Sequence, residues 1–202
     1  MTLPRRALAL VVVSLVIAGC GASTTTLDVG YPAGGAHRAM LASVSPLRIE
    51  IPPLVDRRVD SVRIGAPDKG TSITTSRPVP DIVRDALVTE LGRNGHVVVD
   101  ANQDVILAGE VDEFWLDIVP GYPETHYVGR VALALVAVNA RTGERLVTRR
   151  YVGIRRQQAD PDSPEARRAV MDTALARTMR DLATDRAFVA ALARLRSAGN
   201  GV

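Results

Sequence analysis

The sequence contains very little cysteine, lysine or aromatic residue. Cys20 is the only cysteine among 202 residues, which excludes a disulfide framework and a thiolate metal site. Aromatic residues make up 3% of the chain, so a hydrophobic core has to be built from Val, Leu, Ile and Ala. The net charge is only +3 and its basic residues are interleaved with acids, so we expect no binding to nucleic acid. The fold therefore has to be stabilised by packing alone.

The N-terminus has the layout of a secretory signal peptide. Arg5 and Arg6 precede an unbroken apolar run from Ala7 to Ala18, which is too short for a transmembrane helix of about 20 apolar residues. The stretch Ile17-Ala-Gly-Cys20 resembles the lipobox of bacterial lipoproteins, in which the cysteine is acylated and the preceding bond is cut. The resemblance implies that residues 1–19 are cleaved and that Cys20 anchors the protein to a membrane. A lone cysteine is unexpected in an exported protein, and lipidation accounts for it.

The residue after Cys20 bears on which membrane holds the protein. In lipoprotein sorting, by the same resemblance, Asp at this position retains the protein at the inner membrane. Gly21 is present instead. We therefore expect a location on the periplasmic face of the outer membrane.

Residues 20–45 are predicted to be the acylated cysteine followed by a flexible tether. The segment is rich in Gly, Ala, Ser and Thr and has no lasting hydrophobic period, so it lacks the apolar area that would offset its ordering entropy. Such a tether would have a root-mean-square span of roughly 25–30 Å. It would hold the domain near the membrane without fixing its orientation.

Residues 46–196 are predicted to form one α+β domain, and residues 197–202 to fray. Helices are expected to pack on an antiparallel or mixed sheet. Hydrophobic periodicity predicts strands over 47–51, 59–64, 71–75, 96–100, 104–118, 127–139 and 144–154, and helices over 81–94, 163–182 and from 185 onward.

Two of the predicted strands have special features. In the strand 104–118, apolar residues move from odd positions, as at Val111, to even positions from Phe114, which predicts a bulge near Asp112-Glu113. The strand from Tyr127 to Asn139 is apolar or small on both faces, as expected of a central strand covered on both sides.

Several stretches together resemble the YajG-like lipoproteins. They are the lipobox and polar tether, Ser72-Ile-Thr-Thr-Ser-Arg77 entering the helix Asp81–Asn94, its exit Gly95-His-Val-Val-Val99, and the pairing of Tyr127–Asn139 with Glu144–Ile154 before the C-terminal helices. The resemblance covers roughly residues 47–195 and implies an envelope lipoprotein without an established activity. A broader likeness extends to small α+β lipoprotein domains that bind envelope partners, including activators of peptidoglycan synthases and auxiliary subunits of lipid transporters.

Histidine gives no catalytic or metal-binding pattern. His37, His96 and His126 have no partner at the spacing of a catalytic or zinc motif. Glycines form no phosphate-binding loop either. We therefore expect no metal, no cofactor and no enzymatic activity.

Carboxylates along the strand 104–118 offer the one enzymatic alternative. Glu110 and Asp112 are expected on one face and Glu113 and Asp117 on the other. Paired carboxylates can hydrolyse glycosidic bonds, which would make the protein a peptidoglycan enzyme. The simpler interpretation is the solvated face of an antiparallel sheet. The Arg149-Arg150 and Arg155-Arg156 pairs could neutralise its acids across strands, or contact phospholipid head groups instead.

The candidate partner surface consists of Trp115, Tyr122, Tyr127 and Arg149. Trp115 would be an interface anchor if exposed, although its general burial tendency favours the core. Tyr122 and Tyr127 belong to the turn after Pro120. The sequence therefore predicts a non-catalytic lipoprotein that binds an envelope protein; the alternatives are an auxiliary lipoprotein of a lipid-transport system and a cell-wall enzyme using Glu110, Asp112 or Glu113.

Overall fold

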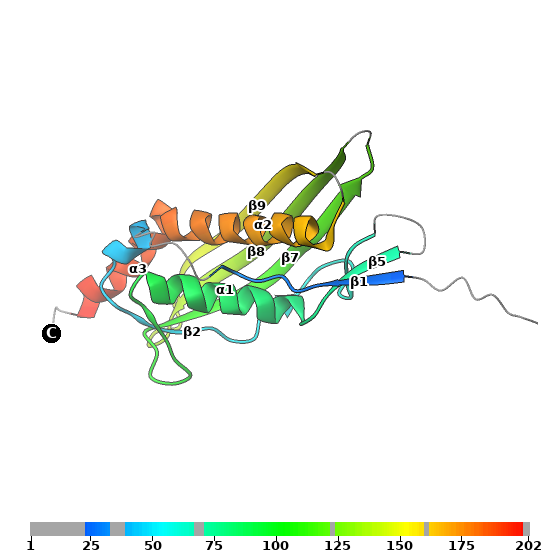
Figure 1. The fold of residues 1–202 in the computed structure, drawn as a ribbon. Helices are drawn as coiled ribbons and strands as arrows, with labels where there is room; N and C mark the ends of the chain where they lie inside the picture. The colour runs from blue at the N-terminus through cyan, green and yellow to red at the C-terminus, as the bar shows by residue number, and fades with distance from the viewer. Residues whose placement is uncertain (1–22, 33–38, 67–70, 122–123, 160–161, 200–202) are drawn as a thin grey trace, which may run out of the picture.

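The computed structural model describes residues 23–32, 39–66, 71–121, 124–159 and 162–199. Its elements are β1 (Ser23–Leu27), η1 (Met40–Ser43), β2 (Arg48–Glu50), β3 (Val55–Asp56), β4 (Arg63–Gly65), β5 (Thr71–Thr75), α1 (Val79–Arg93), β6 (Val97–Val98), β7 (Val105–Val119), β8 (Thr125–Asn139), β9 (Arg145–Ala159), α2 (Pro164–Thr184) and α3 (Arg186–Gly199). Helices packed on mixed sheets make this an α+β fold, as predicted (Figure 1). Within these residues no helix is both long enough and apolar enough to span a membrane.

The larger sheet is built around three strands of 15 residues each. β7, β8 and β9 form an antiparallel meander, and β2 and β3 pair with β7 in parallel. In the order β6-β2-β7-β8-β9, β8 is paired on both sides, so it is an interior strand, as predicted for this stretch. The predicted bulge is confirmed as well, because the register of β7 against β8 shifts between Val111 and Glu113.

Helices α1 and α2 lie side by side on one face of the larger sheet (Figure 1). α2 begins where predicted: the Ser163 hydroxyl accepts a hydrogen bond from the backbone N of Ala166 at 3.1 Å. A Cβ atom at Gly153 of β9 would lie only 2.0 Å from the backbone oxygen of Ala174 in α2. The close packing of this helix therefore requires a residue without a side chain at that point of the strand. The buried stripe of α2 consists of Val170, Met171, Ala174, Leu175, Thr178, Met179, Leu182 and Ala183.

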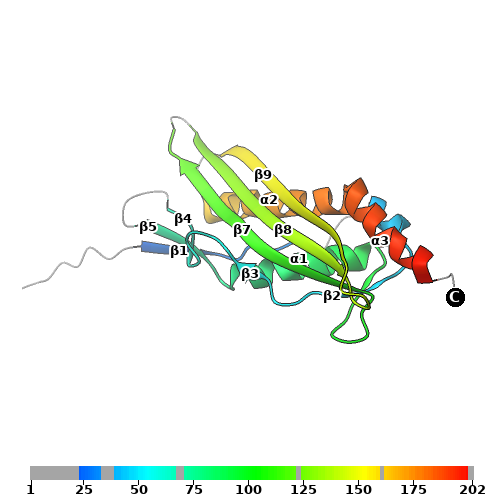
Figure 2. The same ribbon diagram turned by 180° about the vertical axis from the view of Figure 1, so that it is seen from behind.

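No helix of the described residues covers the opposite face of β7, β8 and β9 (Figure 2). The expectation that β8 is covered on both faces is therefore wrong. Leu133 and Leu135 are buried under the helices, whereas Ala134 and Val136 on the other face are only partly buried. Small side chains between longer charged ones on the neighbouring strands need no second layer of helices.

Within the predicted tether 20–45, the described residues 23–32 and 39–45 pack as part of the domain, contrary to expectation. β1 pairs with β5 in parallel, in a three-stranded sheet of order β1-β5-β4. Leu27 is 2% exposed, and Val29, Leu41 and Val44 are buried in the same core. These apolar residues recur at no regular spacing, so periodicity did not reveal them. The described part of the domain starts at Ser23, and Cys20 lies outside the described residues.

Helix α3 begins at the predicted cap and is longer than expected. The Asp185 side chain accepts a hydrogen bond from the backbone N of Ala187 at 2.8 Å. The helix continues to Gly199, past the predicted start of fraying at Ser197.

Candidate interaction surface

The face of the sheet without helices, here called the open face, carries the acidic side chains of β7. Glu110 pairs in register with Ala134 of β8, and Glu113 pairs with Ala132. Both partners occupy even positions of β8, so both glutamates project to the same side. The expectation that Glu113 and Asp117 face away from Glu110 is therefore wrong. The bulge between them reverses the alternation and brings all of these acids to one face.

Each of these carboxylates pairs with an arginine. The pairs are Arg57–Glu110 at 3.3 Å, Arg150–Asp112 at 2.8 Å, Arg130–Glu113 at 2.6 Å and Arg130–Asp117 at 2.6 Å. The two acids beside Arg130 raise the pKa of its guanidinium above the usual value. Each of these carboxylates is already paired with a guanidinium, whereas glycoside hydrolysis uses two carboxyl groups that both face the glycosidic bond. The arrangement fits a neutralised surface better than a catalytic pair.

Trp115 projects onto the open face between two of these acids. Its indole Nε1 donates a hydrogen bond to Asp117 at 2.8 Å, and the side chain is half-buried. The expectation that Trp115 is a core residue is wrong, because the bulge gives the core position to Phe114, which is 1% exposed. An oriented and partly exposed indole is typical of the anchor residues of protein interfaces.

The loop between β3 and β4 is organised by the Arg58 guanidinium. The Arg58 side chain is only 4% exposed and pairs with Asp56 at 2.8 Å. It also donates to the backbone oxygens of Ser61 at 2.7 Å and Arg63 at 3.2 Å. One buried cation thereby connects both ends of the loop, so its conformation is specified before any partner binds.

A second set of hydrogen bonds closes the tip of this loop. The Asp60 carboxylate accepts bonds from the backbone N of Arg63 at 2.8 Å, the Arg63 side chain at 2.5 Å and the backbone N of Val62 at 3.0 Å. The bonds from Arg63, which have the largest effect, lower the pKa of Asp60 to about 2. Val59 and Val62 are consequently held outward, with exposed fractions of 108% and 70%.

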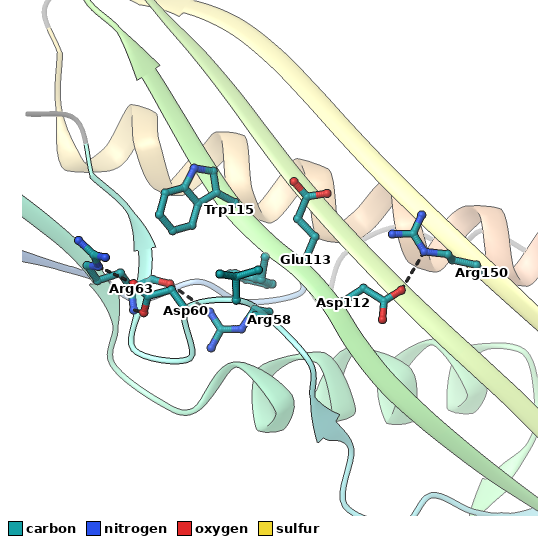
Figure 3. Close-up of a pocket in the computed structure, with 9 residues that line it drawn as sticks. Arg58, Asp60, Arg63, Asp112, Glu113, Trp115 and Arg150 are labelled. Carbon is teal, nitrogen blue, oxygen red and sulfur yellow. Dashed lines mark hydrogen bonds and ion pairs between the residues drawn. The ribbon is translucent and has the colours of Figure 1, made fainter.

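A groove of about 490 Å³ lies between this loop and β7 (Figure 3). Its lining residues are Arg58, Val59, Asp60, Arg63, Asp112, Glu113, Phe114, Trp115 and Arg150. The apolar surface of Val59 and Trp115 is surrounded by charges that already have partners. Apolar anchors within a polar rim are typical of a surface that binds another protein or peptide.

The apolar surface continues across the open face onto β9. Val152 pairs in register with Ala132 and Ile154 with Arg130, so both project to the side of Trp115. They are 37% and 39% exposed. The open face therefore presents apolar side chains from β7, β9 and the β3–β4 loop.

Arg149 is not part of this surface. It pairs in register with Leu135, a buried position on the helix-covered face. Its Nε donates to Asp185, the cap of α3, at 3.0 Å. The fold therefore does not bring Arg149 and Trp115 together on one face.

Tyr127 is also absent from this surface, contrary to expectation. It is 0% exposed, and its hydroxyl donates to Asp162 at 2.5 Å. Burial and this hydrogen bond raise the pKa of Tyr127 to about 12, so the phenol keeps its proton. Tyr122 lies outside the described residues, as do Cys20 and His37.

Within the described ranges, no group of three or more His, Cys, Asp and Glu side chains could hold a metal ion. His96 is buried and its Nδ1 accepts a hydrogen bond from the backbone N of Leu47 at 3.2 Å. Burial lowers the pKa of His96 below its usual value. This histidine connects β2 to the end of α1 and has a structural role.

The sequence did contain a signal for the β3–β4 loop. The stretch Asp56-Arg-Arg-Val-Asp60-Ser-Val-Arg63 alternates acids and arginines at two- and three-residue spacing, which suits local turns with side-chain hydrogen bonds. The strand predicted over 59–64 is present among the described residues only as β4, and residues 57–62 form the loop instead.

Comparison with known proteins shows the fold of the chain. Neither a family model nor a curated sequence matches it. The crystal structure of protein XCC0632 from Xanthomonas campestris, a member of family DUF330, matches with a TM-score of 0.60 and 15% identity, covering 89% of this chain and 100% of that one.

Two looser matches are bacterial proteins described as lipoproteins. Lipoprotein GNA1162 from Neisseria meningitidis has a TM-score of 0.36 and 14% identity over 60% of this chain and 90% of that one. A minor lipoprotein from Acinetobacter baumannii has a TM-score of 0.38 and 14% identity over 67% and 91%. The match to XCC0632 supports the fold alone and does not single out the YajG-like family.

Proposed function

We propose that the protein is a lipid-anchored, non-catalytic lipoprotein of the bacterial envelope whose open face binds an envelope protein. The observation that carries the proposal is the groove between β7 and the β3–β4 loop. There a half-buried Trp115 faces a loop whose own hydrogen bonds keep Val59 fully exposed. A valine held in water adds nothing to the stability of the folded domain, whereas a preformed apolar anchor increases the affinity of a binding surface for its partner.

The sequence supports the anchor and its location. The lipobox-like stretch ending at Cys20 provides the acylation site, and Gly21 favours the periplasmic face of the outer membrane. Acylation by two or more chains is enough for stable membrane attachment. The YajG-like family is our proposal for its relatives.

The test is photocrosslinking in the cell of origin. A benzoylphenylalanine probe would replace Val59, Trp115 or Ile154 on the open face, with Arg141 in the β8–β9 hairpin as an exposed control. We expect one discrete envelope protein to be trapped from the open-face positions and not from the control. Adducts with phospholipid or glycan alone, or equal trapping from Arg141, would contradict the proposal.

Membrane attachment is tested separately with Cys20→Ala. This variant is expected to leave the outer-membrane fraction and to carry no acyl chain by mass spectrometry. A protein found wholly in the inner membrane would contradict the location. Trapped subunits of a lipid transporter would identify the process as lipid transport and favour the role of auxiliary lipoprotein.

The enzymatic alternative has its own test. Glu110→Ala, Asp112→Ala and Glu113→Ala each remove one carboxylate from the open face. Since these groups already pair with arginines, we expect the variants to leave muropeptide profiles unchanged. Altered profiles in any of the three would favour a cell-wall enzyme instead.

A further inference from the structure

The N-terminal strap, residues 23–32, is bonded to the domain along its length. It starts with β1, whose five residues pair with β5 from Ser23↔Thr71 to Leu27↔Thr75. Hydroxyl contacts at 3.3 Å join Ser23 to Thr71 across this pair. The parallel pairing places the first residues of β1 and β5 side by side at the outer end of the smaller sheet.

After β1 the strap crosses both large helices. The backbone N of Gly30 donates to Asp172 of α2 at 2.9 Å. The Tyr31 hydroxyl donates to Glu90 of α1 at 2.5 Å, and burial together with Glu90 raises the pKa of Tyr31 to about 12. The guanidinium of Arg93 lies 4.7 Å from the centre of the Tyr31 ring. These contacts join the strap to each helix and oppose its release from the domain.

This arrangement restricts where the acylated cysteine can be. Cys20 is three residues before Ser23, and three residues of extended chain reach no farther than about 11 Å. A free tether to residue 45 would have allowed roughly 25–30 Å on average and any orientation. The anchor is therefore confined to the outer end of the smaller sheet.

The outer end of the smaller sheet is suited to a phospholipid surface. The described residues of β1, β4 and β5 include no acidic side chain that anionic headgroups would repel. The first residues of the paired strands, Ser23, Thr24, Thr71 and Ser72, all bear hydroxyl groups, which can donate to phosphate oxygens. Within the Ser23–Thr71 pair, one hydroxyl already donates to the other. Helix α3 lies at the opposite end of the described structure (Figures 1 and 2).

We propose that the strap orients the domain on the membrane, with the outer end of the smaller sheet against phospholipid headgroups and α3 pointing away from the bilayer. The inference rests on the proposed acylation of Cys20. Beyond acylation, the inference gives the domain a defined orientation and a second contact surface with the membrane. A partner would then bind the open face at a fixed height above the bilayer.

The experiment measures which end of the acylated protein lies near lipid. Thr24→Cys and Arg194→Cys place one label each at the smaller sheet and on α3, where both side chains are exposed; acylation leaves Cys20 unlabelled. The acylated proteins are reconstituted in vesicles of phosphatidylethanolamine and phosphatidylglycerol that contain a headgroup nitroxide lipid. We expect the label at position 24 to be quenched and the label at position 194 to remain bright.

A second comparison, between the protein with and without an inserted linker, tests whether the short connection from the anchor to the strap sets the orientation. Inserting about 20 Gly and Ser residues between Ala22 and Ser23 leaves the domain intact and gives the anchor a span of roughly 25 Å. Quenching at position 24 should then be lost. Equal quenching at both positions, or no change in quenching on insertion, would overturn the inference. The proposed function would still stand in that case, provided that mass spectrometry shows the chain to be acylated. A chain without acyl groups would overturn both.

Discussion

The two faces of β7, β8 and β9 are made by alternate residues of the same strands, yet they have opposite properties. Under the helices, side chains such as Leu133 and Tyr127 are completely buried. At Gly153 on the same face there is no room for an added Cβ atom. On the open face, arginines and acids pair around Trp115 and leave valine and isoleucine partly exposed. The covered face therefore holds the core of the fold, and the open face is the one that we propose binds a partner.

The largest effect is expected from Gly153→Val on the covered face. The added atoms would overlap the backbone of α2 at Ala174 and Thr178, so the helix would have to shift away from β9. We expect a loss of about 4 kcal/mol in the free energy of unfolding, measured by urea denaturation. The neighbouring Val152→Ala on the open face is the control and should lose about 1 kcal/mol or less. Equal losses would contradict the distinction between the faces.

The second effect tests whether the strap is part of the covered core. Leu27→Ala removes a side chain that is 2% exposed and should cost about 2–3 kcal/mol of unfolding free energy. Thr24→Ala, on the same strand and exposed, should change it by less than about 0.5 kcal/mol. If residues 20–45 were a free tether, both variants would be neutral.

The third effect is a dependence of stability on pH that arises in the covered core. Burial holds the pKa of His96 below its unfolded value of 6.5, so below that pH the unfolded chain binds more protons than the folded one. Stability should therefore fall as the pH drops from 7 towards 5, with a slope of at most about 1.4 kcal/mol per pH unit.

His96→Asn keeps an acceptor for the backbone N of Leu47 and has no titrating ring. Its decrease in stability between pH 7 and pH 5, measured by urea denaturation, should be smaller than that of the natural protein. Parallel pH profiles for the two proteins would show that another group is responsible.

The smallest effect is expected on the open face. Arg150→Gln removes the ion pair with Asp112, in which the arginine side chain is 55% exposed, and such a pair contributes about 0–1 kcal/mol. The melting temperature should hardly change, whereas crosslinking of a partner through the probe at Trp115 should decrease. A large loss of stability with unchanged crosslinking would reverse the roles assigned to the two faces.

Much of the fold could be predicted because local patterns carry it. The change of phase at Asp112 in β7 predicted the bulge, and the Ser163 and Asp185 caps predicted where α2 and α3 begin. The hairpin at Gly143 and the end of α1 at Gly95 coincide with positive φ angles of 74° and 88°. All of these signals depend on residues that are neighbours along the chain.

The candidate surface was predicted less well, because contacts between distant segments decide it. Of the residues proposed for it, Trp115 projects onto the open face, whereas Tyr127 is buried by the Asp162 segment and Arg149 is bonded to the cap of α3. Val59 and Val62 were overlooked because hydrophobic patterning treats an isolated valine as a core residue. Their exposure depends on hydrogen bonds made by Arg58 and Asp60.

The sequence by itself determined the α+β class, the long meander, the helix caps and the lipobox resemblance at Cys20, since each depends on residues that are close together along the chain. Only the tertiary structure decided which face of the sheet is covered, where Trp115 projects, and that residues 23–32 are part of the domain. Leu27 and Tyr31 have no helical or strand period, and their burial arises from β5, α1 and α2, which follow later in the chain. A segment that looks like a tether on its own becomes ordered when distant elements provide the apolar contacts and hydrogen bonds that offset its conformational entropy.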